Sequence, residues 1–326
     1  GWLIGGVHDG IRQMFDIIEQ ARMSIGFKSF STVSTAYLNA LEYAKERVQG
    51  PDLAEAANKS APRVRIIQHP DVRRMLMMLK SYTEAMRGLG LYAAKLQDDV
   101  EVQGGHKASE AQALSRRSDL LLPMIKGYYS EKGYELLAMA LQVFGGSGFT
   151  QDLPHEQYIR DQKIDTLYEG TTAIQALDLF FRKIARDGGE TLRNLLEEVG
   201  ATAASERGGA ALSAEKKALA RALGDVEGIF GTMMQKLGES VYHVGLHGNR
   251  ILFALTEVLL AWTLIRQAEL ASEKLGSANE VDKAFYTGKI AAARFFCADT
   301  LPRVTTARKI IENSSLDLME LDEAAF

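Results

Sequence analysis

The sequence predicts an all-α protein, and two observations carry that prediction. Only 6 of its 326 residues are proline, well below the usual share of about 5%, so few positions force a helix to end. Apolar residues recur at intervals of three and four through most of the chain, as they do along the buried face of a helix. Glycine pairs and prolines separate these stretches and give the order of elements.

The first predicted helix covers residues 10–49. Its apolar residues return at helical spacing as far as Ala44, and a bend is expected near Gly26. Gly50-Pro51 ends the helix, because proline disfavours helical backbone at the residue before it. Residues 51–68 are mixed polar and contain two prolines, so they are predicted to form a loop.

The rest of the first half is predicted as helices separated by glycine turns. Pro123 either kinks its helix or begins a new one at a favoured first-turn position, and Gly188-Gly189 ends the last helix. In chain order these elements are the helices 71–97 and 109–144, the turn 145–148, a short helix 154–161, an irregular link 162–167 and a helix 170–185.

The composition changes after Gly189. Residues 190–212 are rich in alanine, glycine and charge, which suits a connection. Three helices at about 213–238, 240–275 and 280–314 are predicted to form a second antiparallel bundle, followed by an acidic tail over residues 316–326. The sequence therefore predicts two domains, residues 1–187 and 188–326.

Charge and cysteine content exclude several classes of protein. The chain has 38 basic and 42 acidic residues and a net charge of -4, which argues against a nucleic-acid-binding surface. Hydrophobic residues make up 46% and charged residues 25%, as in ordinary globular proteins rather than disordered or fibrous ones. The single cysteine, Cys297, can form no internal disulfide, which fits a reducing compartment or a chain that never needed disulfides. The cytoplasm is taken as the default location.

No membrane or export segment is expected. The most apolar stretch, residues 251–265, is shorter than the roughly 20 residues that a membrane-spanning helix needs and contains Glu257, so we predict a buried helix. The opening GWLIGGVHDG lacks the features of a signal peptide. It also lacks an initiator Met, so the chain is expected to begin part-way through a longer gene product.

Glu169 is the first candidate for chemistry, because it precedes a predicted helix and follows the apolar residues Leu167 and Tyr168. Burial raises the pKa of a carboxylate, whereas a helix N-terminus lowers it. A carboxylate between those effects can act as a base. It could equally complement the helix dipole and do nothing more, and the local sequence leaves both interpretations open.

Two other features could bind a phosphate group. The turn 145–148 lets backbone amides approach a ligand, although it lacks the GxGxxG spacing and could simply terminate a helix. Arg47 could bind a pyrophosphate or complement a helix dipole.

His243 and His247 have the spacing of two metal ligands, but no third ligand is evident and no metal site is predicted.

Together these features resemble the C-terminal helical domain of acyl-CoA dehydrogenases. The resemblance is carried by QVFGGSGF at residues 142–149 and PHEQYIRDQKIDTLYEGTTAIQ at 154–175, in the family's order and spacing. EQARMSIG at 19–26 and KERVQG at 45–50 support it, so it covers about residues 9–187. YTGKIAAARFFCADTLP at 286–302 is similar to the extra C-terminal domain of the larger bacterial members. The implied fold is an antiparallel four-helix bundle followed by a second helical bundle.

The resemblance implies FAD-dependent α,β-dehydrogenation of an acyl-CoA thioester, as in the β-oxidation of fatty acids. Glu169 matches the family's catalytic base, which removes the α-proton while a hydride passes from the β-carbon to flavin N5. Hydrogen bonds to the thioester carbonyl, one of them from the backbone amide of Glu169, would stabilise the enolate. A minority of the family carries its base at the position that is Ala21 here. Alanine cannot act as a base, so Glu169 is the implied base.

The resemblance also implies the binding residues. Positions that match cofactor-binding residues are Arg47, Gln49, His69, Gln142, Gly145, Gly146 and Thr171. Positions that match substrate contacts are Glu19, Arg22, Tyr168 and Gly170. In the family several cofactor contacts reach the flavin of a neighbouring subunit, which implies a homodimer or homotetramer, and an electron-transfer flavoprotein is the implied electron acceptor.

The sequence departs from the family at four points. Gln49 runs directly into Gly50 where the family has an intervening phenylalanine, and Pro70 and Ala173 replace common glutamines. The family's N-terminal helical domain and middle β-domain are not in this chain, so incomplete activity by itself is expected. The competing hypothesis is a non-catalytic helical module for oligomerisation or partner binding. It predicts that Glu169 and Arg47 tolerate substitution while Leu259→Ala breaks assembly.

Overall fold

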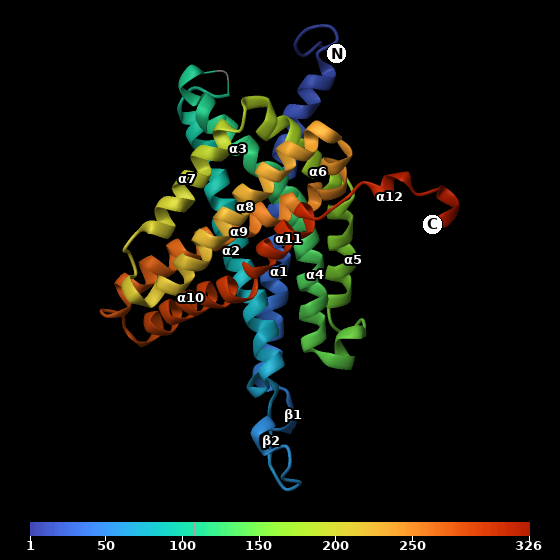
Figure 1. Cartoon of the computed structure of the whole chain (residues 1–326). Coiled ribbons are helices and arrows are strands. Elements are labelled where there is room, and N and C mark those ends of the chain that lie inside the picture. Colours follow the sequence, from blue (N-terminus) through green and yellow to red (C-terminus); the bar gives the residue numbers. More distant parts are fainter. Residues whose placement is uncertain (107) are drawn as a thin grey trace.

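The computed structural model describes residues 1–106 and 108–326, and for Asp16 the backbone alone. The described residues form helices and one small antiparallel sheet (Figure 1), which confirms the predicted all-α class. The α-helices of the first half are α1 (Gly10–Glu46), α2 (Pro70–Val102), α3 (Gln112–Pro123), α4 (Tyr129–Val143), α5 (His155–Lys163) and α6 (Thr172–Leu177). Those of the second half are α7 (Glu190–Ala204), α8 (Ser213–Glu239), α9 (Tyr242–Leu275), α10 (Glu280–Asp299), α11 (Pro302–Glu312) and α12 (Asp317–Glu320).

The first half is a bundle built on two long helices. α1 packs against α2 and α4, and α5 covers α4. α1 and α2 run side by side and carry a hairpin at one end (Figure 1). The hairpin consists of β1 (Val48–Pro51) and β2 (Arg63–Arg65), so the prediction of a plain loop over residues 51–68 was wrong there. Strands this short leave no alternating pattern in the sequence from which to recognise them.

Gly26 does not interrupt α1, which is a single helix through that residue. A Cβ at Gly26 would overlap the side chain of Ile125 and lie 2.9 Å from its backbone oxygen. The glycine is therefore needed for close packing against the chain that follows α3. That chain is a π-helical turn, Met124–Tyr128, which begins directly after Pro123 and leads into α4. Pro123 thus marks a widened turn within a continuous helical run.

The second half differs from the prediction at two places. Residues 190–204 form α7 rather than a connection, and α7 buries Leu192, Leu195, Leu196 and Val199. Those four residues have helical spacing that the surrounding alanine, glycine and charge obscure. The predicted helix 280–314 is broken at Leu301-Pro302 into α10 and α11, as expected for a proline at the first position of a helix.

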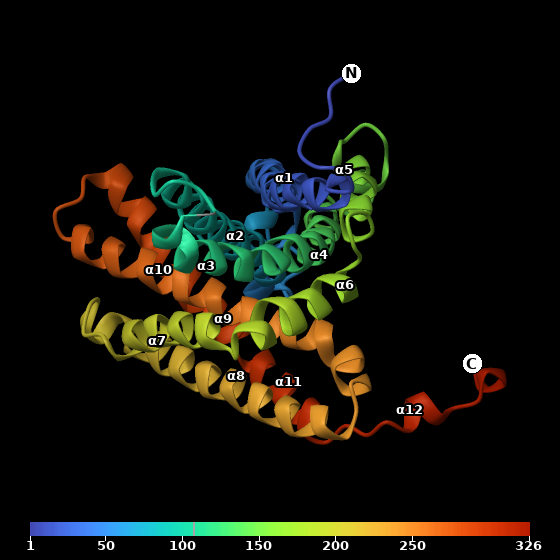
Figure 2. The same cartoon turned by 90° about the horizontal axis from the view of Figure 1, so that it is seen from above.

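α9 is the central helix of the second half and also contacts the first. It packs on α8 and α10 and on α2 and α6 (Figure 2). Its length and apolar composition meet the criteria for a membrane span, but 83% of the apolar window is buried inside the protein, as predicted for residues 251–265. The predicted domain boundary at residues 187 and 188 stays a prediction, and one buried apolar cluster extends across it.

A carboxyl group lies in this core. Glu257 of α9 is buried, and its Oε1 accepts a hydrogen bond of 3.1 Å from the hydroxyl of Tyr128. Burial raises the pKa of Glu257 to about 7, although the nearby charge of Lys132 opposes the rise. A carboxyl that keeps its proton when folded but loses it when unfolded makes stability depend on pH.

We predict that Gly26→Ala lowers the free energy of unfolding of this chain by about 1–3 kcal/mol, because the added methyl overlaps Ile125. Denaturant unfolding measures the change. The control is Gly224→Ala on α8, where a Cβ meets nothing within 4 Å and better helix propensity should raise stability by up to about 1 kcal/mol. Equal effects of the two substitutions would contradict the proposed close contact.

A second prediction concerns pH. The folded carboxyl of Glu257 titrates near pH 7, above the 4.5 of a free glutamate. Its contribution to stability is present below pH 4.5 and is lost as the pH rises to 7, by up to about 3 kcal/mol. Glu257→Gln should remove this component, whereas Glu280→Gln at the exposed start of α10 should not. Denaturant unfolding at pH 5 and pH 8 tests this, and parallel pH profiles for Glu257→Gln and the native chain would refute it.

Candidate active site

Glu169 lies in a tight turn before α6. Its φ is 56° and that of Gly170 is 97°, so two successive residues adopt left-handed backbone. This conformation costs about 1–2 kcal/mol for a residue with a Cβ, whereas glycine adopts it readily. Such strain persists only where the surroundings hold it in place.

Three side chains from different elements hold this turn. Arg22 of α1 donates to the carbonyl oxygen of Glu169 at 3.4 Å. Gln175 of α6 donates to the carbonyls of Glu169 and Gly170 at 3.2 and 3.4 Å. Lys126, in the π-helical turn, donates to the carbonyl of Gly170 at 2.5 Å. The backbone carbonyls of the two left-handed residues therefore both accept hydrogen bonds from side chains of the bundle.

The carboxylate of Glu169 has a free oxygen. Its Oε2 is buried and has no hydrogen-bond partner among the described residues. An unpartnered buried carboxylate oxygen is energetically costly, so it is a candidate to receive a proton or a ligand. The backbone N–H of Glu169 likewise donates to no backbone carbonyl in the described part of the chain.

The charges around the turn shift two neighbouring groups. Burial lowers the pKa of Lys126 to about 8, Arg22 lowers it further, and Glu169, Asp165 and Glu131 oppose the change. Burial, together with the charge of Asp165, raises the pKa of Tyr168 to about 12. Tyr168 is therefore a neutral phenol, and its side chain is 40% exposed beside Glu169.

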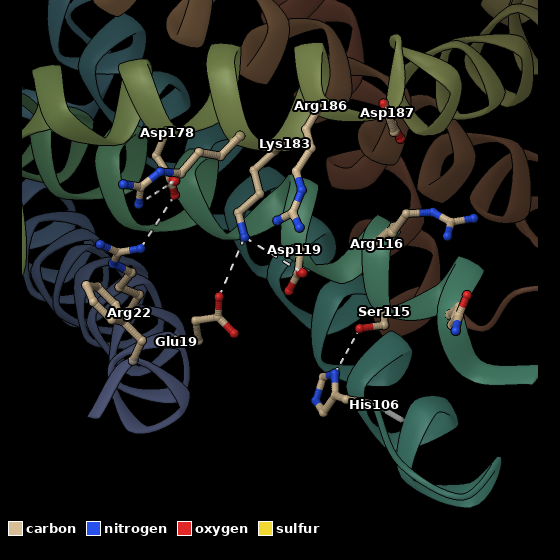
Figure 3. A pocket seen from close by; sticks show the side chains of 13 residues that line it. Glu19, Arg22, His106, Ser115, Arg116, Asp119, Asp178, Lys183, Arg186 and Asp187 are labelled. Atoms are coloured by element: carbon tan, nitrogen blue, oxygen red, sulfur yellow. Dashed lines mark hydrogen bonds and ion pairs between the residues drawn. The ribbon is translucent and has the colours of Figure 1, made fainter. Parts of the chain in front are cut away.

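A charged pocket of about 720 Å³ is lined by Arg22, the residue that donates to the Glu169 carbonyl, and by Glu19, Asp119, Asp178 and Lys183 (Figure 3). Lys183 stands between Glu19 and Asp119, with Nζ 3.5 and 3.7 Å from their carboxylate oxygens. Arg22 pairs with Asp178 at 3.5 Å, so the guanidinium that supports the Glu169 turn also forms a wall of this pocket. The structure thus brings the predicted substrate residues Glu19, Arg22, Tyr168 and Gly170 to one end of α1.

The predicted cofactor residues lie mostly at the other end of α1. Arg47 is the C-cap of α1 and is exposed. Gln49 is in β1, and its carbonyl oxygen lies 2.7 Å from Nε2 of His69. Thr171 is the exception among the cofactor predictions, because it is the N-cap of α6 beside Glu169.

The glycine turn lies at the same end as Arg47. The ring of Phe144, which directly precedes the turn, lies 4.5 Å from that of Tyr43 in the last turns of α1. Gly145 has a φ of 58°, and neither it nor Gly146 has any atom within 4 Å of an added Cβ. Gln142 is exposed on the last turn of α4, so all three residues face open space near the C-terminal end of α1.

The two groups are far apart within one chain. Arg22 and Arg47 are 25 residues apart along α1, which at 1.5 Å per residue is about 37 Å. The residues around Glu169 and those around Arg47 therefore cannot contact the same small molecule in a single copy of the chain.

Sequence reasoning missed Lys126, Gln175 and Asp178. Lys126 carries a recognisable signal, since it stands in the apolar run LLLPMIKGYY at residues 120–129 and lysine is almost never fully buried without a partner. Nothing in the sequence shows that Asp178 faces Arg22, because the two are 156 residues apart and meet only in the folded chain.

The two histidines of α9 have other neighbours. Nε2 of His243 lies 3.2 Å from a carboxylate oxygen of Glu239, and Nδ1 of His247 lies 3.1 Å from the guanidinium of Arg250. Burial, reinforced by Arg250, lowers the pKa of His247. Among the described residues, no three His, Cys, Asp or Glu side chains gather as a metal site would require.

Comparison with known families assigns both halves of the chain. Residues 8–182 match the family profile described as "Acyl-CoA dehydrogenase, C-terminal domain". Residues 195–322 match the profile described as "Acetyl-CoA dehydrogenase C-terminal like". The two profiles together cover most of the chain.

Curated relatives carry names of the same kind. The chain is 49% identical to the broad-specificity linear acyl-CoA dehydrogenase FadE5 of Mycobacterium tuberculosis, over 100% of this chain and 54% of the relative. It is 31% identical to the 3-methylmercaptopropionyl-CoA dehydrogenase of Ruegeria pomeroyi, over 98% of this chain and 53% of the relative. The chain therefore spans about half the length of the curated relatives it matches.

Solved structures share the fold. An acyl-CoA dehydrogenase from Bacillus anthracis, solved with FAD, superposes with a TM-score of 0.72 at 18% identity, over 97% of this chain and 52% of that one. The ACDH-11 protein of Caenorhabditis elegans, solved with C11-CoA, superposes with a TM-score of 0.68 at 19% identity, over 95% of this chain and 49% of that one.

Proposed function

This chain belongs to the acyl-CoA dehydrogenase family, and we propose that a complete polypeptide containing it removes hydrogen from the α- and β-carbons of an acyl-CoA thioester, with Glu169 as the base. The proposal concerns the complete polypeptide, because the chain spans about half the length of its relatives. We propose that the chain alone lacks full activity and that an electron-transfer flavoprotein is the electron acceptor.

The observation that carries the proposal is the free Oε2 of Glu169. A general base must have an oxygen that is not already satisfied by a donor, and it must reach the proton that it removes. Oε2 of Glu169 is buried and unpartnered among the described residues. The neighbouring phenol of Tyr168 stays neutral at physiological pH, since its pKa is about 12, so it adds no competing negative charge.

The backbone of the same residue supports the removal of an α-proton. An α-proton of a thioester becomes acidic enough only if charge on the carbonyl oxygen is stabilised as the proton leaves. The N–H of Glu169 is not used by another backbone carbonyl in the described residues, so it is available as a donor. The held turn fixes this N–H and the direction in which the side chain of Glu169 leaves the backbone.

The chain also has residues that fit FAD. Arg47 is a guanidinium at an exposed helix end, which can bind a pyrophosphate through two nitrogens, and Gln49 and His69 lie beside it. Gly145 and Gly146 leave open space for close approach of a ligand to the backbone. When bound, FAD accepts the hydride from the β-carbon.

The distance along α1 favours an assembly of at least two copies. Arg47 and Arg22 are about 37 Å apart on one helix, whereas the flavin ring and the pyrophosphate of FAD are joined by a ribityl chain of only five carbons. FAD held by Arg47 of one copy would therefore serve Glu169 of another. We propose a homodimer or homotetramer on this basis.

The alternative is a non-catalytic helical module. The left-handed turn at Glu169, which three side chains hold in place, argues against it. Backbone strain of this kind persists mainly at functional sites, and a module that only assembles has no use for it beside a carboxylate. Leu259→Ala does not discriminate the two hypotheses, because Leu259 is fully buried within the chain. Its truncation would create a cavity in the core whatever the function.

We predict that Glu169→Gln in the complete polypeptide keeps bound flavin but slows its reduction by acyl-CoA by at least about 10²–10⁴-fold, the usual contribution of a positioned base. Stopped-flow absorbance of the flavin measures the rate. Glu131→Gln is the control, since Glu131 lies near the turn but accepts a hydrogen bond from Thr172 at 2.6 Å. Normal flavin reduction in Glu169→Gln would reject Glu169 as the base.

We further predict that Arg47→Ala weakens FAD binding by about tenfold or more, because a charged hydrogen bond to pyrophosphate contributes about 1.5–3 kcal/mol. Titration of the complete apoprotein with FAD, followed by visible absorbance, gives the dissociation constant. Lys45→Ala is the control, because Lys45 lies in the same last turn of α1 and pairs with Glu42. Equal affinity for Arg47→Ala and the native protein would reject this part of the site.

A further inference from the structure

Lys126 is a fully buried lysine that the proposed chemistry does not use. It lies in the π-helical turn Met124–Tyr128, and every residue of that turn is buried. A buried ammonium needs strong compensation. Among the described residues its ammonium makes a single hydrogen bond, the 2.5 Å contact to the carbonyl oxygen of Gly170, so its compensation comes from the turn that carries Glu169.

The neighbours of Lys126 leave its backbone little freedom. A Cβ at Gly26 would meet the backbone oxygen of Ile125 at 2.9 Å, and a Cβ at Gly127 would meet Leu252 at 3.0 Å and Gln175 at 3.1 Å. The residues on both sides of Lys126 are thus packed between α1, α6 and α9. This packing fixes the point from which the lysine side chain reaches the turn.

The other two donors to the turn are weaker. Arg22 and Gln175 make contacts of 3.2–3.4 Å, at the long end for N–H···O bonds. Arg22 is also paired with Asp178, and Gln175 is uncharged. A short hydrogen bond from an ammonium is both stronger and charged.

We propose that Lys126 is a positioning residue for the base: its ammonium holds the Gly170 carbonyl, which fixes the left-handed turn that presents the carboxylate of Glu169, and its positive charge lies close to that carboxylate. This role rests on the proposed function of Glu169. Lys126 does not touch the substrate in this scheme, and it acts only through the turn.

The charges that face Lys126 come from four parts of the fold. Arg22 on α1 is the like charge, and Glu169, Asp165 before the turn, and Glu131 on α4 are the opposite charges. Asp165 is also paired with Lys28 at 2.9 Å, and Glu131 accepts from Thr172. Asp165 also has one unpartnered oxygen, Oδ2, but its Oδ1 is held by Lys28. Glu169 is the carboxylate in this set that has neither an ion pair nor a hydrogen-bond partner among the described residues, so it should respond most to loss of the ammonium.

The test uses the complete, flavin-loaded polypeptide and compares Lys126→Met with Lys132→Met. Lys132 is the matched control, because it is a second buried lysine six residues further along the same helical run but pairs with Glu135. The readout is the pH profile of flavin reduction by acyl-CoA. We expect Lys126→Met to move the pH of half-maximal rate upward by about one unit, through loss of a nearby positive charge, and Lys132→Met to leave it within about 0.3 units.

Two further measurements separate the possible outcomes. Lys126→Gln keeps an N–H donor, one bond closer to the backbone, and removes the charge, so it should also shift the profile even if Lys126→Met does not fold. Amide hydrogen exchange of residues 168–172, measured without substrate, should quicken in Lys126→Met because the turn loses its shortest hydrogen bond. An unshifted profile in Lys126→Gln, or equal shifts for the two methionine variants, would overturn the proposal.

Failure of the proposed function would look different. In that case the native protein would show no acyl-CoA-dependent flavin reduction, or Glu169→Gln would reduce its flavin normally. If Glu169 is the base but Lys126 has no positioning role, the native protein shows flavin reduction that Glu169→Gln removes. The pH profile of that reduction then stays the same when Lys126 is changed.

Discussion

The left-handed turn at Glu169 and Gly170 is the constraint on which the rest of the site depends. Two successive positive φ angles place a carboxylate and its own N–H in one small region, and such a turn does not persist without support. The support comes from α1 through Arg22, from α6 through Gln175 and from the π-helical turn through Lys126. Side chains from three parts of the bundle therefore hold this one turn in place.

The length of α1 imposes the second constraint. Arg22 lies in the first half of this helix, and the C-terminal end leads into the hairpin with Gln49 and His69 beside Arg47. A rigid helix keeps Arg22 and Arg47 about 37 Å apart, so the proposed site would take its two parts from two copies. This separation is the reason why the proposed function includes an assembly of at least two copies.

Much of this could be predicted from the sequence. Helical spacing located the long helices, and the block from Gln142 to Gln175 identified the family and made Glu169 the predicted base. The hairpin, α7 and the support of the turn could not be predicted. The two strands are only three and four residues long. The apolar residues of α7 are interspersed with alanine and charged residues, which makes their helical spacing hard to recognise. The hydrogen bond of Lys126 joins residues 44 positions apart. Spacing along a helix predicts which face is buried, but not which distant carbonyl a buried lysine meets.

The most direct test of the central claim separates proton removal from hydride transfer. An acyl-CoA whose β-carbon bears no hydrogen can lose an α-proton but cannot be oxidised, so exchange of its α-deuterium with water reports the base alone. The account predicts that the complete flavin-loaded polypeptide catalyses this exchange and that Glu169→Gln abolishes it. Exchange that continues at the native rate in Glu169→Gln would contradict the account, because another group would then be removing the proton.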